Sequence, residues 1–72
     1  MNNKALDKAN KAARLAISEE QLGNEQAAEQ AARTAGALYH TAGLDLDQAF
    51  TLVGGKAALT WSALVDGWYA AA

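Results

Sequence analysis

Alanine at helical spacing limits this chain to closely packed helices with a thin core. The 72-residue sequence contains 19 alanines and no proline. Alanine has the highest helix propensity of the amino acids, and its short side chain lets two helix axes approach to roughly 8 Å. Because a methyl group buries little apolar surface, we expect a marginally stable core that depends on the few larger apolar side chains.

Those larger apolar side chains are concentrated in the second half of the chain. Of the 37 apolar residues, 18 are larger than alanine, and 13 of these lie between Leu38 and Tyr69. The strand-type alternation of apolar and polar residues is not found. We therefore predict an all-α fold with a single helical domain, residues 1–72. It is a compact mini-bundle of three to four helices, in which an alanine-rich antiparallel hairpin is capped by a short helix and an aromatic C-terminal helix.

The first predicted helix begins near the N-terminus of the chain. It runs from about Lys4 to Ser18 or a little beyond, and Gly23 ends any extension. Either Asn2 or Asn3 is its predicted N-cap. Its apolar residues recur at helical spacing and define one face, which consists of Ala5, Leu6, Ala9, Ala12, Ala13, Ala16 and Ile17.

The second predicted helix lies between two capping signals. Asn24 is predicted as its N-cap, and Gly43 followed by Leu44 predicts a Schellman motif at its C-terminus. Its apolar face consists of Ala27, Ala28, Ala31, Ala32, Ala35, Leu38, Tyr39 and Ala42. His40 falls on the opposite, polar face, near the helix end where a cation interacts favourably with the dipole.

The last two predicted helices carry most of the large apolar side chains. Asp45 and Gln48 have the spacing of a capping box and open a short helix that ends at Gly54. The last helix runs from about Lys56 to Ala70. Its face is the strongest in the chain and consists of Ala57, Ala58, Trp61, Leu64, Val65, Trp68 and Tyr69. The opposite side carries a strip that allows close helix contact in an oligomer, made of Ala63, Gly67 and Ala71.

Reactive and metal-ligating residue types are scarce in this sequence. The chain has no cysteine, and His40 is its single histidine, so the usual ligands of structural zinc are lacking. The segment Gly54-Gly55-Lys56 lacks the remaining residues of a phosphate-binding P-loop and is interpreted as a helix break. We therefore expect a non-enzymatic protein with no catalytic residue, no metal site and no cofactor.

Targeting and membrane signals are also missing from the sequence. Met1 to Lys11 contains three lysines and no apolar run, so we expect no leader peptide. No stretch approaches the roughly eighteen apolar residues of a membrane span. These patterns predict a cytoplasmic protein that does not bind membranes.

Charge is unevenly distributed along the chain. Residues 1–14 carry a net charge of +3 and residues 15–53 a net charge of -5, whereas the whole chain carries -2. The first helix also carries a stripe, at alternating spacings of four and three, that lies away from the alanine face and consists of Lys4, Lys8, Lys11, Leu15, Ser18 and Leu22. Such a stripe offers apolar anchors within a basic rim to an acidic or mixed partner surface. The alternative is a solvated face, with Leu15 and Leu22 tucked under the loop.

The stripe and the aromatic end of the last helix together give the candidate partner-binding residues. Tryptophan and tyrosine are included because they are enriched among interface anchors. The candidates are Lys4, Lys8, Lys11, Arg14, Leu15, Leu22, Trp68 and Tyr69. The four cations also allow a nucleic-acid contact, although only with a modest and salt-sensitive affinity.

Residues 4–47 resemble a small helical-hairpin domain of unknown function that is common in bacteriophage and actinobacterial proteins. The similar elements are Ala13-Arg14-Leu15-Ala16, the polar loop with Asn24, the stretch from Glu25 to Ala32, and Ala42-Gly43-Leu44-Asp45. The family brings no activity and no catalytic residues. The resemblance implies a phage or prophage context, a host bacterial cytosol, and a hairpin surface that contacts other proteins.

A weaker and partial resemblance concerns residues 46–64. The order Leu46-Asp47, Ala49, Val53-Gly54-Gly55, Ala58-Leu59 and Ala63-Leu64 is similar to the opening half of a Cro-type helix-turn-helix repressor. Where that family places its turn and recognition helix, this chain has Val65-Asp66-Gly67-Trp68. Because the recognition helix reads the major groove, the resemblance supports helix packing and gives little support to operator binding.

The leading hypothesis is a small, plausibly phage-encoded regulator that binds a large host complex. RNA polymerase or a defence nuclease is the expected type of partner, which the protein would modulate or inhibit. One alternative is a self-assembling virion or scaffold component, and another is a degenerate helix-turn-helix DNA-binding protein.

Overall fold

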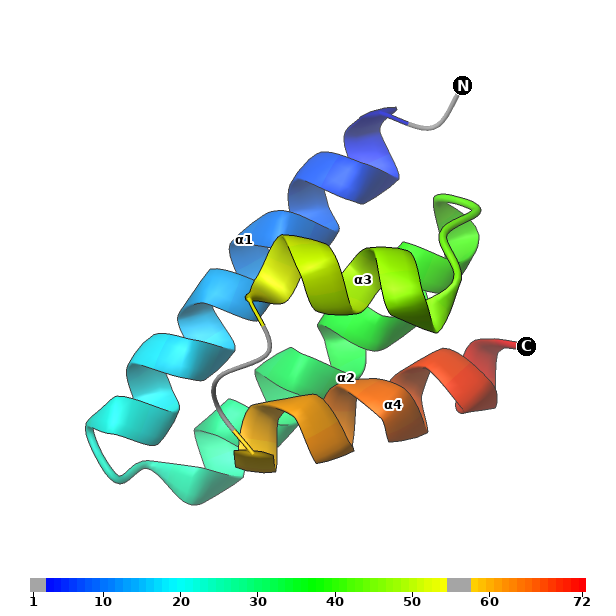
Figure 1. Cartoon of the computed structure of the whole chain (residues 1–72). Helices are drawn as coiled ribbons and strands as arrows, with labels where there is room; N and C mark the ends of the chain where they lie inside the picture. The colour runs from blue at the N-terminus through cyan, green and yellow to red at the C-terminus, as the bar shows by residue number, and fades with distance from the viewer. Residues whose placement is uncertain (1–2, 55–57) are drawn as a thin grey trace.

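The part of the chain that the structure describes folds into four helices, which confirms the predicted all-α mini-bundle. The computed structural model describes residues 3–54 and 58–72 (Figure 1). Its helices are α1 (Asn3–Gln21), α2 (Glu25–Thr41), α3 (Leu46–Val53) and α4 (Ala58–Ala71). Asn2 as an N-cap, and residues 55–57 in the predicted helix break and helix start, lie outside the described residues.

Helix α2 is central, with α1 and α4 packed against it. The first two helices form the predicted antiparallel hairpin (Figure 1). Helix α4 runs parallel to α2, since Thr60 near its start contacts Glu20 at the end of α1, whereas Trp68 near its end contacts Leu44 beyond α2. The short helix α3 lies in the connection that brings the chain back for this parallel arrangement.

Local signals set most of the helix ends as predicted. At the end of α2, Leu44 N–H donates to the Tyr39 carbonyl and Gly43 N–H to the His40 carbonyl, each at 3.0 Å, which is the predicted Schellman motif. Gly43 has a φ of +85°, a left-handed conformation that favours glycine. The capping box at the start of α3 is also confirmed. Its side-chain bonds are Gln48 N–H to Asp45 Oδ1 at 2.8 Å and Asp45 N–H to Gln48 Oε1 at 3.0 Å.

The N-cap prediction at Asn24 was correct in position and wrong in mechanism. Asn24 precedes α2, but its side chain makes no capping hydrogen bond. Instead, its Nδ2 donates to Glu19 Oε2 at 2.8 Å. Since an N-cap needs a side-chain oxygen directed at the first turn, this bond to α1 leaves Asn24 as a link across the α1–α2 loop.

The buried core is thin, as its alanine content predicts. It consists of Ala9, Ala13, Ala16, Ala32, Ala35, Tyr39, Ala49, Ala63 and Leu64. Tyr39 and Leu64 are its two large side chains, and both are fully buried. The Tyr39 hydroxyl donates to Asn10 Oδ1 at 2.6 Å, so the single buried phenol is paired. Burial raises the pKa of Tyr39, and the positive charge of Arg14 opposes this shift.

The buried face of α4 differs from the predicted one. Its buried residues are Thr60, Ala63, Leu64 and Gly67, so Ala63 and Gly67 of the strip predicted for an oligomer contact instead pack against α2, whereas Ala71 is exposed. A Cβ added at Gly67 would overlap the Arg33 carbonyl oxygen, and one added at Gly36 would overlap the Leu64 carbonyl oxygen. The two glycines therefore bring the backbones of α2 and α4 into direct contact, which no larger residue at these positions would allow.

The two tryptophans of α4 lie at the edges of this contact and are half-buried. Trp61 meets Phe50 of α3 edge to face, with ring centroids 4.9 Å apart. Trp68 meets His40 of α2 in the same geometry at 4.9 Å, and its indole Nε1–H donates to the Leu44 carbonyl at 2.9 Å. Both tryptophans thus join α4 to its neighbours, and His40 contributes to this packing from the face predicted to be polar.

Glu20 joins the end of α1 to the first turn of α4. Its Oε1 accepts hydrogen bonds from the Thr60 backbone N–H at 2.7 Å and from the Thr60 hydroxyl at 2.6 Å. The first backbone N–H groups of a helix have no partner within the helix, so a carboxylate from elsewhere in the chain stabilises them. The hydrogen bond from the Thr60 hydroxyl is the largest effect and lowers the pKa of Glu20, desolvation opposes it, and the backbone N–H groups of Thr60 and Leu59 lower the pKa further.

Acidification is expected to weaken the protein through this contact. A carboxyl with a lowered pKa contributes stability above its unfolded-state pKa, near 4.5, and that contribution is lost as the pH falls through the lowered value. We expect the melting temperature of Glu20→Gln to change less than that of the wild type between pH 6 and pH 2. Glu29→Gln is the control, because Glu29 makes only a solvent-exposed pair with Arg33 at 3.7 Å. Parallel pH profiles for wild type and Glu20→Gln would contradict this role.

Candidate interaction surface

The stripe predicted on α1 is exposed along its whole length. We call it the α1 stripe: Lys4, Lys8, Lys11, Leu15, Ser18 and Leu22, all of which are exposed. Leu15 is 54% exposed and Leu22 is 70% exposed. The alternative in which these two leucines are tucked under the loop is therefore wrong. Two large apolar side chains therefore face solvent beyond the end of a row of three lysines.

Arg14 is exposed but belongs to another side of α1. At about 100° per residue, Arg14 lies about 80° around the helix axis from the centre of the α1 stripe. Its charge acts on Tyr39, which bonds to Asn10. The structure therefore groups Arg14 with the polar residues above the buried tyrosine and separates it from the three lysines of the stripe.

The two aromatic candidates of α4 differ in their surroundings. The Trp68 ring is half-buried and its only nitrogen is hydrogen-bonded to Leu44, so this side chain serves the packing of α4. Tyr69 is 62% exposed and its ring touches that of Trp68 at a centroid distance of 5.2 Å. Of the pair, Tyr69 is the one that offers surface to a partner, and it does so from a different helix than the α1 stripe.

A shallow groove between α1 and α2 adjoins the α1 stripe. It has a volume of about 350 Å³ and is lined by Ala12, Leu15, Ala27, Gln30, Ala31 and Thr34. Leu15 belongs to both the stripe and the groove wall. Leu15 therefore lies beside the methyl groups that line the groove. A partner side chain can contact these methyl groups, because none of the described residues that line the groove is charged.

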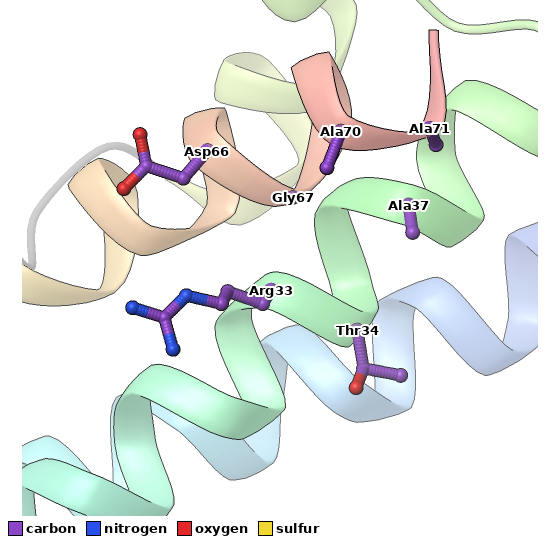
Figure 2. A pocket seen from close by; sticks show the side chains of 7 residues that line it. All are labelled: Arg33, Thr34, Ala37, Asp66, Gly67, Ala70 and Ala71. Atoms are coloured by element: carbon purple, nitrogen blue, oxygen red, sulfur yellow. The ribbon is translucent and has the colours of Figure 1, made fainter.

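A second groove runs between α2 and α4, with a volume of about 530 Å³ (Figure 2). Its lining is Arg33, Thr34, Ala37, Asp66, Gly67, Ala70 and Ala71. Figure 2 shows Arg33 and Asp66 on opposite sides of the groove, and the short side chains of Ala37, Ala70 and Ala71 further along it. Thr34 lines both grooves, so they flank α2 on one face of the molecule.

The alanine floor beside Leu15 was not among the predicted site residues. The predicted apolar face of α2 assigned Ala27 and Ala31 to the core, whereas Ala27 is exposed and Ala31 is half-buried. The width of the predicted apolar face of α2 already indicated that some of its alanines are accessible. At about 100° per residue, this face spans roughly 140°. A single antiparallel neighbour covers a narrower arc, so part of such a wide alanine face remains accessible.

Within residues 3–54 and 58–72, no three His, Cys, Asp or Glu side chains gather closely enough to hold a metal ion. None of the helices in the described part of the chain combines the length and apolar character needed to cross a membrane.

Comparison with known proteins gives no relative from which to transfer a function. The chain matches no protein-family model, no curated protein and no solved structure. The candidate site therefore rests on the exposed α1 stripe and on the groove beside it.

Proposed function

We propose that this protein is a non-enzymatic regulator that binds another protein through the α1 stripe. The observation that carries the proposal is the exposure of Leu15 and Leu22 on the same face as three lysines that precede them along α1. Fully burying an exposed leucine contributes about 1.5–3 kcal/mol, and because Leu15 and Leu22 are 54% and 70% exposed, covering both supplies about 2–4 kcal/mol. The neighbouring cations favour an acidic or mixed partner surface.

The groove between α1 and α2 supports the same reading. A partner side chain that contacts Leu15 also reaches the methyl groups of Ala12 and Ala31. The phage context implied by residues 4–47 makes a large bacterial complex, such as RNA polymerase or a defence nuclease, the proposed partner. Binding would modulate or inhibit that complex by occlusion or bridging.

Leu15→Glu is expected to abolish capture of the partner. The wild-type protein, immobilised at low density, should retain one stoichiometric protein complex from a bacterial lysate at several salt concentrations. Replacing Leu15 removes the apolar anchor and places a carboxylate against an acidic surface, so we expect a loss of at least tenfold in captured protein, equivalent to about 1.4 kcal/mol.

Leu52→Glu is the matched control for this experiment. Leu52 lies on α3 and is 52% exposed, nearly the same as Leu15, so the two changes introduce the same charge at equal solvent exposure. Capture by Leu52→Glu should equal that of the wild type. Recovery of no stoichiometric partner by the wild type, or equal recovery by Leu15→Glu, would contradict the proposed function.

A further inference from the structure

The α1 stripe has the spacing of a coiled-coil seam. Its members follow one another at alternating steps of four and three residues, which is the a/d pattern that keeps one face of a helix directed at a partner helix. All of them are exposed, and the alanine face of α1 that packs against the rest of the protein lies nearly opposite. A second helix can therefore lie along the stripe without meeting the body of the protein.

Charge decides the direction in which a second copy of this helix fits. The first half of α1 carries Lys4, Lys8 and Lys11. The end of α1 carries Glu19 and Glu20, and Glu25 is the first residue of α2; Glu20 already accepts two hydrogen bonds from Thr60. A parallel pairing would set lysine against lysine at three seam positions, whereas an antiparallel pairing sets the basic half of each helix against the acidic end of the other.

We propose that the protein forms an antiparallel homodimer through the α1 stripe. One register pairs the second half of the seam: Leu15 lies opposite Ser18 of the second copy, and Leu22, which lies just past the end of α1, is opposite the methylene stem of Lys11. The two Leu15 side chains then flank the twofold axis, separated by about 4.5 Å along the helix at 1.5 Å per residue. Serine opposite leucine lets the two helices approach closely at the centre.

In the same register, the charged groups form pairs at both ends of the seam. Lys8 lies near the start of α2 of the second copy, where Glu25 is, and Lys11 lies beside Glu19. Glu19 Oε2 already accepts a hydrogen bond from Asn24, so its other oxygen remains to accept from the lysine. Because the interface is isologous, every pair occurs twice.

Self-association covers Leu15 and Leu22, so it competes with the docking proposed above but does not depend on it. The seam is short, since α1 contains 19 residues and only two leucines per copy lie in it. An interface of this size is at the weak end of specific association, so we expect a dissociation constant on the order of 100 μM.

Charge reversal with the purified protein alone tests the proposal by sedimentation equilibrium. From about 10 μM to 1 mM, the average mass of the wild type should rise toward that of a dimer. Lys8→Glu/Lys11→Glu and Glu19→Lys/Glu25→Lys each place like charges together, so each should weaken association about tenfold or more. The quadruple variant restores opposite charges at every pair and keeps the net charge of the wild type, so it should dimerise again.

Circular dichroism on each variant checks that the helices remain folded, since Glu19→Lys also removes the acceptor of Asn24. A wild type that stays monomeric to 1 mM would overturn the homodimer and leave the α1 stripe to a different protein. A dimer that survives both charge reversals equally would overturn the antiparallel seam. Neither result bears on capture of a partner from a lysate at low density, so the two proposals fail independently.

Discussion

Gly67→Ala is expected to lower the melting temperature by about 10–15 °C. Alanine at a helix interior normally gains about 1 kcal/mol over glycine. Here the added Cβ would overlap the Arg33 carbonyl oxygen and lie 2.7 Å from the Arg33 Cα, both backbone atoms of α2 that cannot rotate away. Overpacking costs roughly 3 kcal/mol at such a site, which leaves a net loss of roughly 2 kcal/mol. For a domain of this size, each kcal/mol shifts the melting temperature by about 4–8 °C.

Gly36→Ala should behave in the same way, because its Cβ would overlap the Leu64 carbonyl oxygen and lie 2.7 Å from the Trp68 backbone nitrogen. Ser62→Ala is the matched control. Ser62 is exposed on α4, so the same alanine residue at that position acts through helix propensity alone. Thermal unfolding followed by circular dichroism measures all three variants. Higher melting temperatures for both glycine variants would show that α2 and α4 are not in backbone contact.

Tyr39→Ala is expected to reduce the free energy of unfolding by about 3–5 kcal/mol, the range for removing a large aromatic side chain from a core. Tyr39 is fully buried among alanines, which are too short to fill the space that its ring leaves. The substitution also removes the hydrogen bond to Asn10. A domain of 72 residues has a total stability of roughly 4–11 kcal/mol, so this single change removes much of it.

Urea denaturation measures this loss, with Tyr69→Ala as its control. Tyr69 is the same residue type at 62% exposure, so its removal should change the free energy of unfolding by less than about 1 kcal/mol. Tyr39→Phe keeps the ring and loses only the hydroxyl, and it should fall between the two at roughly 1–2 kcal/mol. A loss below 1 kcal/mol for Tyr39→Ala would exclude Tyr39 from the core.

The helix ends were predictable because their signals act over a few residues. The Schellman motif at Gly43 and the capping box of Asp45 and Gln48 need only neighbours within five positions, so their geometry follows from residue type and spacing. At Asn24, the local signal was not sufficient. Its side chain had two accessible partners, the first turn of α2 and Glu19, and the position of α1 decided between them.

The sequence predicted which residues form the α1 stripe but not which residues surround it. The alternating spacing from Lys4 to Leu22 placed the α1 stripe on one helix face, and the structure decided that its two leucines are exposed. The groove beside Leu15 needed the position of α2, which leaves Ala27 and Ala31 uncovered. Arg14 and Trp68 were assigned to a partner from residue type alone, whereas their places relative to Tyr39 and Leu44 are tertiary properties.

The sequence by itself determined three short-range features: helical structure, its breaks at glycine, and the caps at Gly43 and Asp45. Only the tertiary structure decided which face of α4 is buried. Apolar content favoured the face of Trp61 and Trp68, but Gly36 and Gly67 lie 31 positions apart and gain their role only when α2 and α4 meet. The same is true of Glu20 and Thr60. Periodicity reports how apolar a face is, whereas close packing depends on the matching shapes of two surfaces that are distant in the chain.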